Sequence, residues 1–185
     1  DCLLSRGLGD VYKRQFLKDG ESIYNTLLVS KPGAGKTTCL RDCIRSLSNG
    51  KEGWEGMKIC VVDERSEIAA CHLGIPQNDM GIRTDVLSGC GKSEGMMLML
   101  RSMSPQIIAV DELGGKKDFQ AVEQAACSGV RILGTVHADT VEELWEKPLK
   151  KWMKRGIFER FILIRHNRSG ERDFQVFNGK REQLC

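Results

Sequence analysis

Short apolar runs alternate with amphipathic stretches along most of this chain. Four of the runs have the length and composition of buried strands: NTLLVS at 25–30, KICVVD at 58–63, QIIAVD at 106–111 and RILGTV at 131–136. Helical patterns separate them and cover residues 36–48, 94–104 and 119–127. Continuously apolar strands are typical of a parallel sheet with helices on both faces. The pattern therefore predicts an α/β fold with a mostly parallel sheet.

Three further segments depart from that alternation. Residues 73–93 are rich in Gly, Pro, Asn and Asp, and they are predicted to form a long loop. A helix is predicted over 140–155. Two strands, 158–166 and 173–178, are predicted to pair as a C-terminal β-hairpin around Arg168-Ser169-Gly170.

Composition narrows the class of protein. The 185 residues suit one domain, 41% of them are hydrophobic and 29% are charged, and the net charge of +3 is too small to require a polyanionic partner. No apolar run approaches the roughly 20 residues that span a bilayer, so no transmembrane segment is predicted. The eight cysteines form no CxxC pair, which favours a reducing, cytoplasmic location.

The first fifteen residues, DCLLSRGLGDVYKRQ, match nothing that follows. We interpret residues 1–15 as a leader that is not native to the protein, and residues 16–185 as one domain. On this interpretation we expect that a native N-terminal domain is missing.

The strongest chemical signal follows the first strand. The sequence SKPGAGKTT at 30–38 fits the phosphate-binding pattern G-x-x-x-x-G-K-[ST], except that Ser30 replaces the first glycine. Such a loop directs backbone N–H groups at phosphate oxygens, at the positive end of the following helix. It predicts a site for ATP and Mg²⁺ in which Lys36 contacts the β- and γ-phosphates and Thr37 binds the metal. The predicted nucleotide-binding residues are Lys31, Pro32, Gly33, Ala34, Gly35, Lys36, Thr37 and Thr38.

A shorter match to the same pattern lies at Gly91-Lys92-Ser93. Val86 stands where the pattern needs its leading glycine, and no strand is predicted before it. The triplet is therefore interpreted as part of the long loop at 73–93.

The strand IIAVDE at 107–112 ends in two carboxylates. This is the Walker B form, in which Asp111 is predicted to hold Mg²⁺ and Glu112 to orient and deprotonate the attacking water. Because neighbours on a strand point to opposite sides, the two side chains are expected to have different roles. Together with the P-loop, the pair predicts ATP hydrolysis.

Polar residues also end two other predicted strands. Asp63 and Glu64 follow KICVV, and His137 follows RILGTV. The carboxyl ends of parallel strands lie at one edge of a sheet, where open α/β sheets bind their ligands. We therefore expect these residues to converge with Lys36 and the Walker B pair. Glu64 is a second candidate for the catalytic base, and His137 is predicted to sense the γ-phosphate.

These residues resemble a family. VVDERSEIAAC, GIRTDV, GMMLMLRSMSP, IIAVDELG and GTVHAD, within about residues 22–165, are similar to the sporulation stage III protein AA family. They resemble more distantly the hexameric motor ATPases of type II and type IV secretion and of pilus retraction. The resemblance implies a RecA-like P-loop NTPase core that forms a hexameric ring with ATP between subunits. It also implies membrane-protein partners in a secretion-like channel between mother cell and forespore, with this protein peripheral to the membrane.

The resemblance also assigns positions. The acidic box, the Walker B glutamate and the histidine box of the secretion ATPases fall on Asp63-Glu64-Arg65, Glu112 and His137. Those ATPases carry an arginine shortly after the Walker B glutamate, where this chain reads LGGKK. They also use arginines from a preceding N-terminal domain. The candidates for such contacts within this chain are Arg65, Arg83 and Arg101.

Two other functions stay open at this point. One is a nucleic-acid-dependent ATPase, because the same core serves such enzymes and the segment 145–160 combines tryptophans with lysines and arginines. The simpler interpretation is a helix whose Trp145, Leu149 and Trp152 face the core while the lysines face solvent, so no nucleic acid is expected. The other is a slow, nucleotide-gated switch, against which the paired Asp111 and Glu112 argue.

Overall fold

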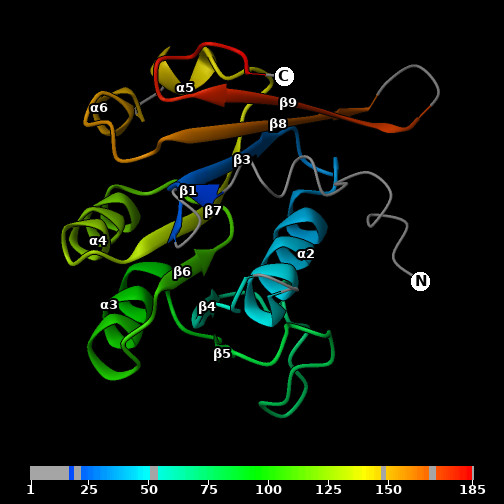
Figure 1. Ribbon diagram of the computed structural model, residues 1–185, viewed down its shortest axis with the longest axis vertical. Helices are drawn as coiled ribbons and strands as arrows, with labels where there is room; N and C mark the ends of the chain where they lie inside the picture. The colour runs from blue at the N-terminus through cyan, green and yellow to red at the C-terminus, as the bar shows by residue number, and fades with distance from the viewer. Residues whose placement is uncertain (1–16, 19–21, 51–53, 147–148, 167–169, 185) are drawn as a thin grey trace.

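A central seven-stranded sheet organises the protein. The computed structural model describes residues 17–184 except 19–21, 51–53, 147–148 and 167–169, so the leader proposed at 1–15 lies outside the described residues. The strands of this sheet are β3 (Thr26–Ser30), β4 (Ile59–Asp63), β5 (Thr84–Ser88), β6 (Ile107–Val110), β7 (Arg131–His137), β8 (Arg160–His166) and β9 (Arg172–Asn178). Their order across the sheet is β5-β4-β6-β7-β3-β8-β9 (Figure 1). A separate antiparallel pair is formed by β1 (Leu17–Lys18) and β2 (Ser22–Ile23).

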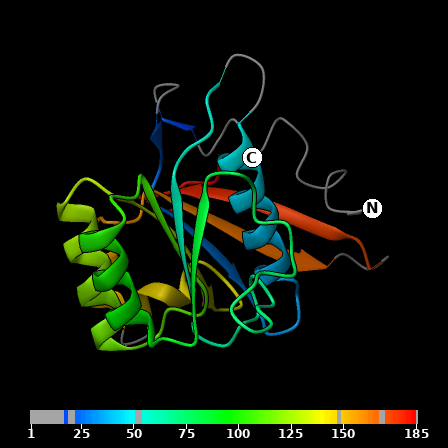
Figure 2. The same cartoon turned by 90° about the horizontal axis from the view of Figure 1, so that it is seen from below.

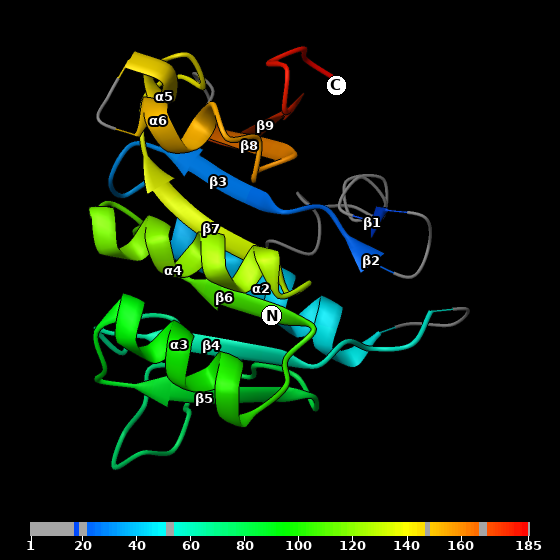
Figure 3. The same ribbon diagram turned by 90° about the vertical axis from the view of Figure 1, so that its left-hand side faces the viewer.

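The sheet is parallel except at one edge. Every neighbouring pair from β5 to β8 is parallel, and only β9 runs antiparallel to its neighbour β8. The predicted mostly parallel sheet and C-terminal hairpin are therefore confirmed, while the turn predicted around Arg168-Ser169-Gly170 lies largely outside the described residues. The arrowheads of β3, β5, β6 and β7 all point to the same side in Figure 3. Their carboxyl ends thus form one continuous edge.

Helices cover both faces of the sheet. One face carries α2 (Lys36–Asn49), and the other carries α3 (Lys92–Ser102), α4 (Lys116–Cys127) and two short helices, α5 (Glu143–Glu146) and α6 (Lys150–Met153) (Figures 2 and 3). Two separate apolar cores result, because successive strand residues point to opposite faces. Among the described residues, no helix is long and apolar enough to cross a membrane.

Two expectations about secondary structure were wrong. The segment 73–93 contains β5 and the start of α3 rather than loop alone. β5 has no continuous apolar run because it is an edge strand whose residues are all only half-buried. The helix expected over 140–155 is two short helices, and the sequence between them includes a proline, which has no N–H to donate to a continuous helix.

The apolar residues of this C-terminal segment lie where the pattern predicts. Leu149 and Trp152 are buried, and Trp145 packs against the same core. Trp152 stacks on Phe119 of α4 with 5.8 Å between ring centroids, and Trp145 meets Phe161 of β8 edge-on at 5.1 Å. The aromatic faces of this segment are thus used for packing.

Candidate functional site

The P-loop connects β3 to α2 at the carboxyl edge of the sheet. Gly33 and Gly35 have φ of 76° and 87°, a left-handed backbone that residues with a Cβ rarely adopt. Gly35 is the N-cap of α2, so the first N–H groups of this helix, which have no partner within the helix, point back toward the loop. This geometry fits a phosphate chain, because orphan N–H groups and the positive helix end both favour an anion.

Lys36 is held inside the loop. It is only 5% exposed, and its Nζ donates to the backbone carbonyl of Lys31 at 3.1 Å and to His137 Nδ1 at 3.0 Å. Burial lowers the pKa of Lys36, and the nearby charges of Asp111 and Glu112 oppose that shift. Two hydrogen bonds thus fix the position and orientation of the Lys36 ammonium.

Thr37 and Asp111 form the second contact between the P-loop and the sheet. Thr37 Oγ1 donates to Asp111 Oδ2 at 2.6 Å, and the buried Thr135 of β7 donates to the other oxygen of the same carboxylate. A hydroxyl and a carboxylate are oxygen ligands of the kind that Mg²⁺ prefers. The two residues predicted to hold the metal therefore have suitable chemistry and lie together.

Glu112 leaves the strand in an unusual conformation. β6 ends at Val110, and Glu112 has φ of 51°, which costs about 1–2 kcal/mol for a residue with a side chain. Its backbone N–H donates to Thr135 Oγ1 at 2.8 Å and thereby helps to hold this turn. Asp111 and Glu112 have different surroundings, as expected. Both follow the last residue of β6, however, so their side chains diverge because of the turn at Glu112 and not because neighbours on a strand alternate between faces.

The carboxylate of Glu112 has two cationic or polar partners. His137 Nε2 lies 3.0 Å from Oε1, and Arg65 Nη1 donates to Oε2 at 2.8 Å. The hydrogen bond from His137 is the largest cause that holds the pKa of Glu112 below its usual value, and the charge of Arg65 adds to it while partial burial opposes it. Glu112 is therefore ionised at neutral pH.

His137 links the P-loop to Glu112. The ammonium of Lys36 can only donate, so Nδ1 of His137 accepts from it, and Nε2–H donates to Glu112. Register explains the placement, because His137 is paired with Ser30 at the ends of β7 and β3. Lys36, His137, Glu112 and Arg65 thus form one continuous network.

The acidic box after β4 divides into two parts. Asp63 is 2% exposed, and its carboxylate accepts hydrogen bonds from the backbone N–H groups of Glu67, Ile68 and Ala69. Glu64 is more exposed and pairs with Lys92 at the start of α3. Asp63 and Glu64 line one small depression together with Arg65, Lys92, Asp111 and Glu112.

Two residues of this arrangement were not found from the sequence. Lys92 belongs to the GKS triplet interpreted as loop, but β5 precedes that triplet and α3 begins at Lys92. Thr135 lies within an apolar strand, and only its register beside β6 brings it to the Walker B pair. The triplet's position before a methionine-rich helix was an available signal; for Thr135 the sequence contained none.

The remaining candidate arginines lie elsewhere. Arg83 pairs with Glu55 at 3.4 Å and lines a groove with Trp54 and Met103, beside the start of β5. Arg101 is exposed in the last turn of α3. Of the three candidates, only Arg65 contacts the site.

Solved structures define the class of fold. The ATPase DotB of Legionella pneumophila matches 96% of this chain with a TM-score of 0.69 and 17% identity. The VirB11 ATPase from the Brucella suis type IV secretion system matches 97% of it with a TM-score of 0.62 and 14% identity. The domain therefore has the α/β fold of secretion ATPases. The chain spans 50% and 56% of those two proteins.

The sequence defines the family within that class. The model of the family "Sporulation stage III, protein AA" matches residues 6–184, and this chain belongs to that family. The stage III sporulation protein AA of Bacillus subtilis is 44% identical over 139 residues, which are 75% of this chain and 45% of that protein. The chain thus spans less than half the length of this relative.

Proposed function

We propose that this domain binds ATP with Mg²⁺ at the P-loop and hydrolyses it. The observation that carries the proposal is that a P-loop lysine, a hydroxyl–carboxylate pair and an ionised glutamate lie together at one edge of the sheet. These are Lys36 and Glu112, which His137 joins, and the pair Thr37 and Asp111. Binding, metal ligation and activation of water need these groups in this proximity.

Each residue has a defined role in the proposal. The backbone of residues 31–38 cradles the phosphates, and Lys36 neutralises the β- and γ-phosphates. Thr37 and Asp111 hold Mg²⁺, which when bound neutralises charge on the phosphate oxygens. Glu112 accepts the proton of the attacking water, since each of its carboxylate oxygens can accept a further hydrogen bond. His137, which contacts Glu112, is the proposed sensor of the γ-phosphate. Glu64, which pairs with Lys92, is the second candidate for the catalytic base.

The biological role follows from the family as an inference. We propose that the full-length protein is the motor of a secretion-like channel in sporulation, bound peripherally to the membrane from the cytoplasm. By analogy with secretion ATPases, we propose that it works as a hexameric ring. A ring needs head-to-tail contacts between copies. Light scattering of the full-length protein with ATP should give the mass of a ring, and a monomer at high concentration would contradict the motor.

Packing of the aromatic residues disfavours the nucleic-acid-dependent alternative. Trp152 stacks on Phe119 and Trp145 meets Phe161 edge-on, so both rings pack against the domain rather than being presented to bases. The test is ATP turnover with Mg²⁺, measured with and without single-stranded DNA or RNA. We expect turnover that depends on Mg²⁺ and is unchanged by nucleic acid. A large stimulation would favour the alternative, and full-length protein that releases no phosphate would contradict the proposed hydrolysis.

A further inference from the structure

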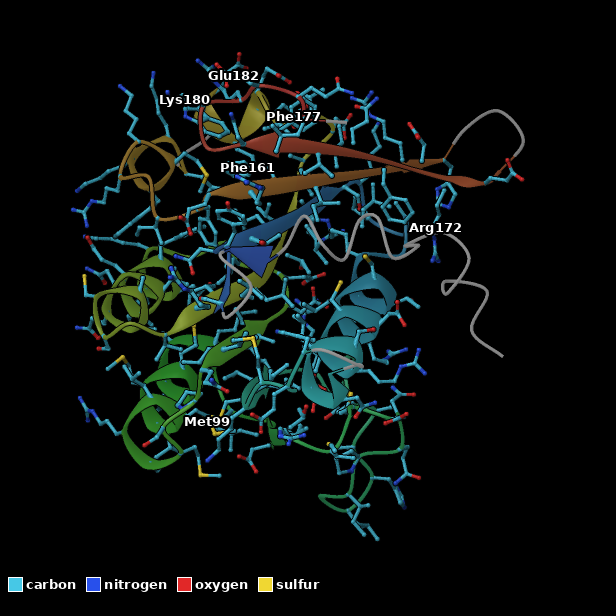
Figure 4. The ribbon with its side chains drawn as sticks, viewed as in Figure 1. Met99, Phe161, Arg172, Phe177, Lys180 and Glu182 are labelled. Carbon is cyan, nitrogen blue, oxygen red and sulfur yellow. The ribbon has the colours of Figure 1, made fainter. Side chains whose placement is uncertain are left out.

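Arg172, on the edge strand β9, lies directly against the P-loop. It is the first residue of β9 and is paired in register with His166, the last residue of β8. β8 runs parallel to β3 but continues three residues beyond the last paired position, Val29↔Leu163, so the hairpin projects past the edge where the P-loop begins. Figure 4 shows Arg172 on the side of the hairpin that faces α2.

The contact with the loop is close. A Cβ added to Gly35 would lie 2.6 Å from Arg172 Nη2 and 2.9 Å from its Cζ, so the guanidinium packs on the backbone of this glycine. Gly35 is the N-cap of α2. The pKa of Cys39, one turn further along the same helix, is raised chiefly by its hydrogen bond with Cys43 and by burial, and the nearby charge of Arg172 opposes that shift. The guanidinium therefore sits beside the first turn of α2.

This position places a cation beside the positive end of a helix. Lysine and arginine are favourable near helix C-termini and unfavourable near N-termini. Among the described residues, Arg172 has no carboxylate within ion-pair distance to offset that arrangement. An anion between the guanidinium and the N–H groups of the first turn would be favourable to both, because it accepts hydrogen bonds from each.

The strands on the two sides of the P-loop indicate which phosphate of a bound nucleotide would lie next to Arg172. Lys36 and Thr37 contact His137 and Asp111, which belong to β7 and to the end of β6 on one side of β3. Those contacts mark the end of the loop for the γ-phosphate and the metal. β8 and β9 lie on the other side of β3, so Arg172 lies at the opposite end of the phosphate chain.

We propose that Arg172 binds the α-phosphate of the nucleotide, as a cationic clamp supplied by the C-terminal hairpin. This inference rests on the proposed ATP site. It adds a residue that the P-loop and Walker B patterns do not contain, and it gives the hairpin a role in binding nucleoside di- and triphosphates. Because ADP and ATP share the α-phosphate, Arg172 should contribute equally to the binding of both.

Calorimetry with Mg-ATP and Mg-ADP tests the clamp. Arg172→Ala should weaken binding of both nucleotides by about tenfold and by the same factor, the scale expected for one hydrogen bond to a charged group. Arg172→Lys should recover part of the loss because it keeps the charge without the planar fork. The control is Arg181→Ala, since Arg181 lies after the same strand over Trp145, away from the P-loop, and should bind both nucleotides like the parent.

The possible results separate this inference from the function on which it rests. Parental binding that persists in Arg172→Ala, or a loss confined to ATP, contradicts the clamp and leaves the ATP site intact. A parent chain that binds neither nucleotide contradicts the ATP site itself. Thermal unfolding of each variant identifies misfolded protein, and Arg172→Lys provides the comparison if Arg172→Ala does not fold.

Discussion

Two neighbouring strands of the sheet, β4 and β6, run into the same tripeptide, Val-Asp-Glu, at 62–64 and 110–112. After β4, Asp63 accepts hydrogen bonds from three backbone N–H groups and Glu64 pairs with a lysine. After β6, Asp111 meets a hydroxyl of the P-loop and Glu112 meets His137. The first aspartate stabilises a loop, whereas the second contacts the candidate nucleotide site.

The difference between the two pairs comes from their neighbours in the sheet. β6 lies beside β7, whose Thr135 and His137 reach Asp111 and Glu112. β4 lies beside the edge strand β5, and the chain after Glu64 folds back over Asp63. An identical tripeptide therefore has a structural role in one place and a proposed catalytic role in the other.

The largest expected difference between the two pairs is in turnover. Glu112→Gln keeps the shape of the side chain but cannot accept a proton, so ATP hydrolysis should fall by about a hundredfold or more while ATP affinity stays close to parental. Glu64→Gln is the matched change after β4 and should keep most of the activity. Steady-state phosphate release measures both. Parental turnover in Glu112→Gln, with a large loss in Glu64→Gln, would move the base to Glu64.

The two aspartates should differ in what their loss affects. Asp63→Ala leaves buried N–H groups without an acceptor and should lower the free energy of unfolding by about 2 kcal/mol, measured by denaturant titration. Asp111→Asn should instead raise the Mg²⁺ concentration for half-maximal turnover, because it weakens the proposed metal site. If Asp63→Ala is as stable as the parent, the structural role assigned to Asp63 is wrong.

A smaller effect concerns the pH dependence of Glu112. Its pKa lies below the usual value chiefly because His137 donates a hydrogen bond to it. A carboxyl with a depressed pKa in the folded state stabilises the fold above its unfolded pKa, and this contribution is lost as pH falls through the folded pKa. For turnover, loss of that hydrogen bond in His137→Ala should raise the pKa of Glu112, so the acid limb of kcat/KM should move to higher pH. His72→Ala, at an exposed position between β4 and β5, is the control, and an acid limb that stays in place in His137→Ala would contradict the assigned cause.

Much of the candidate site could be predicted because its parts are contiguous in the sequence. The P-loop at 31–38 and the pair Asp111 and Glu112 each follow an apolar strand, so motif and context are visible together. Thr135 and Arg172 could not be found in this way. Each reaches the site through strand pairing between segments far apart in the chain, and neither carries a motif.

For the same reason, the sequence did not distinguish the structural role of Asp63 from the proposed metal-binding role of Asp111. The sequence places Asp63 and Asp111 in equivalent positions, each directly after an apolar strand. Their tertiary partners distinguish them: Asp63 accepts from the backbone N–H groups of residues 67–69, which any residue except proline can supply, whereas Asp111 meets the hydroxyls of Thr37 and Thr135.

The most direct measurement of the central claim is calorimetric titration of Mg-ATP into the parent chain and into Lys36→Ala. Among the described residues, the Lys36 ammonium donates to a loop carbonyl and to His137, and no strand or helix depends on these two hydrogen bonds, so the fold should survive its loss, as circular dichroism can verify. We expect saturable binding by the parent and no measurable binding by the variant. Equal ATP affinity in the two proteins would contradict the assignment of residues 31–38 as a nucleotide-binding loop.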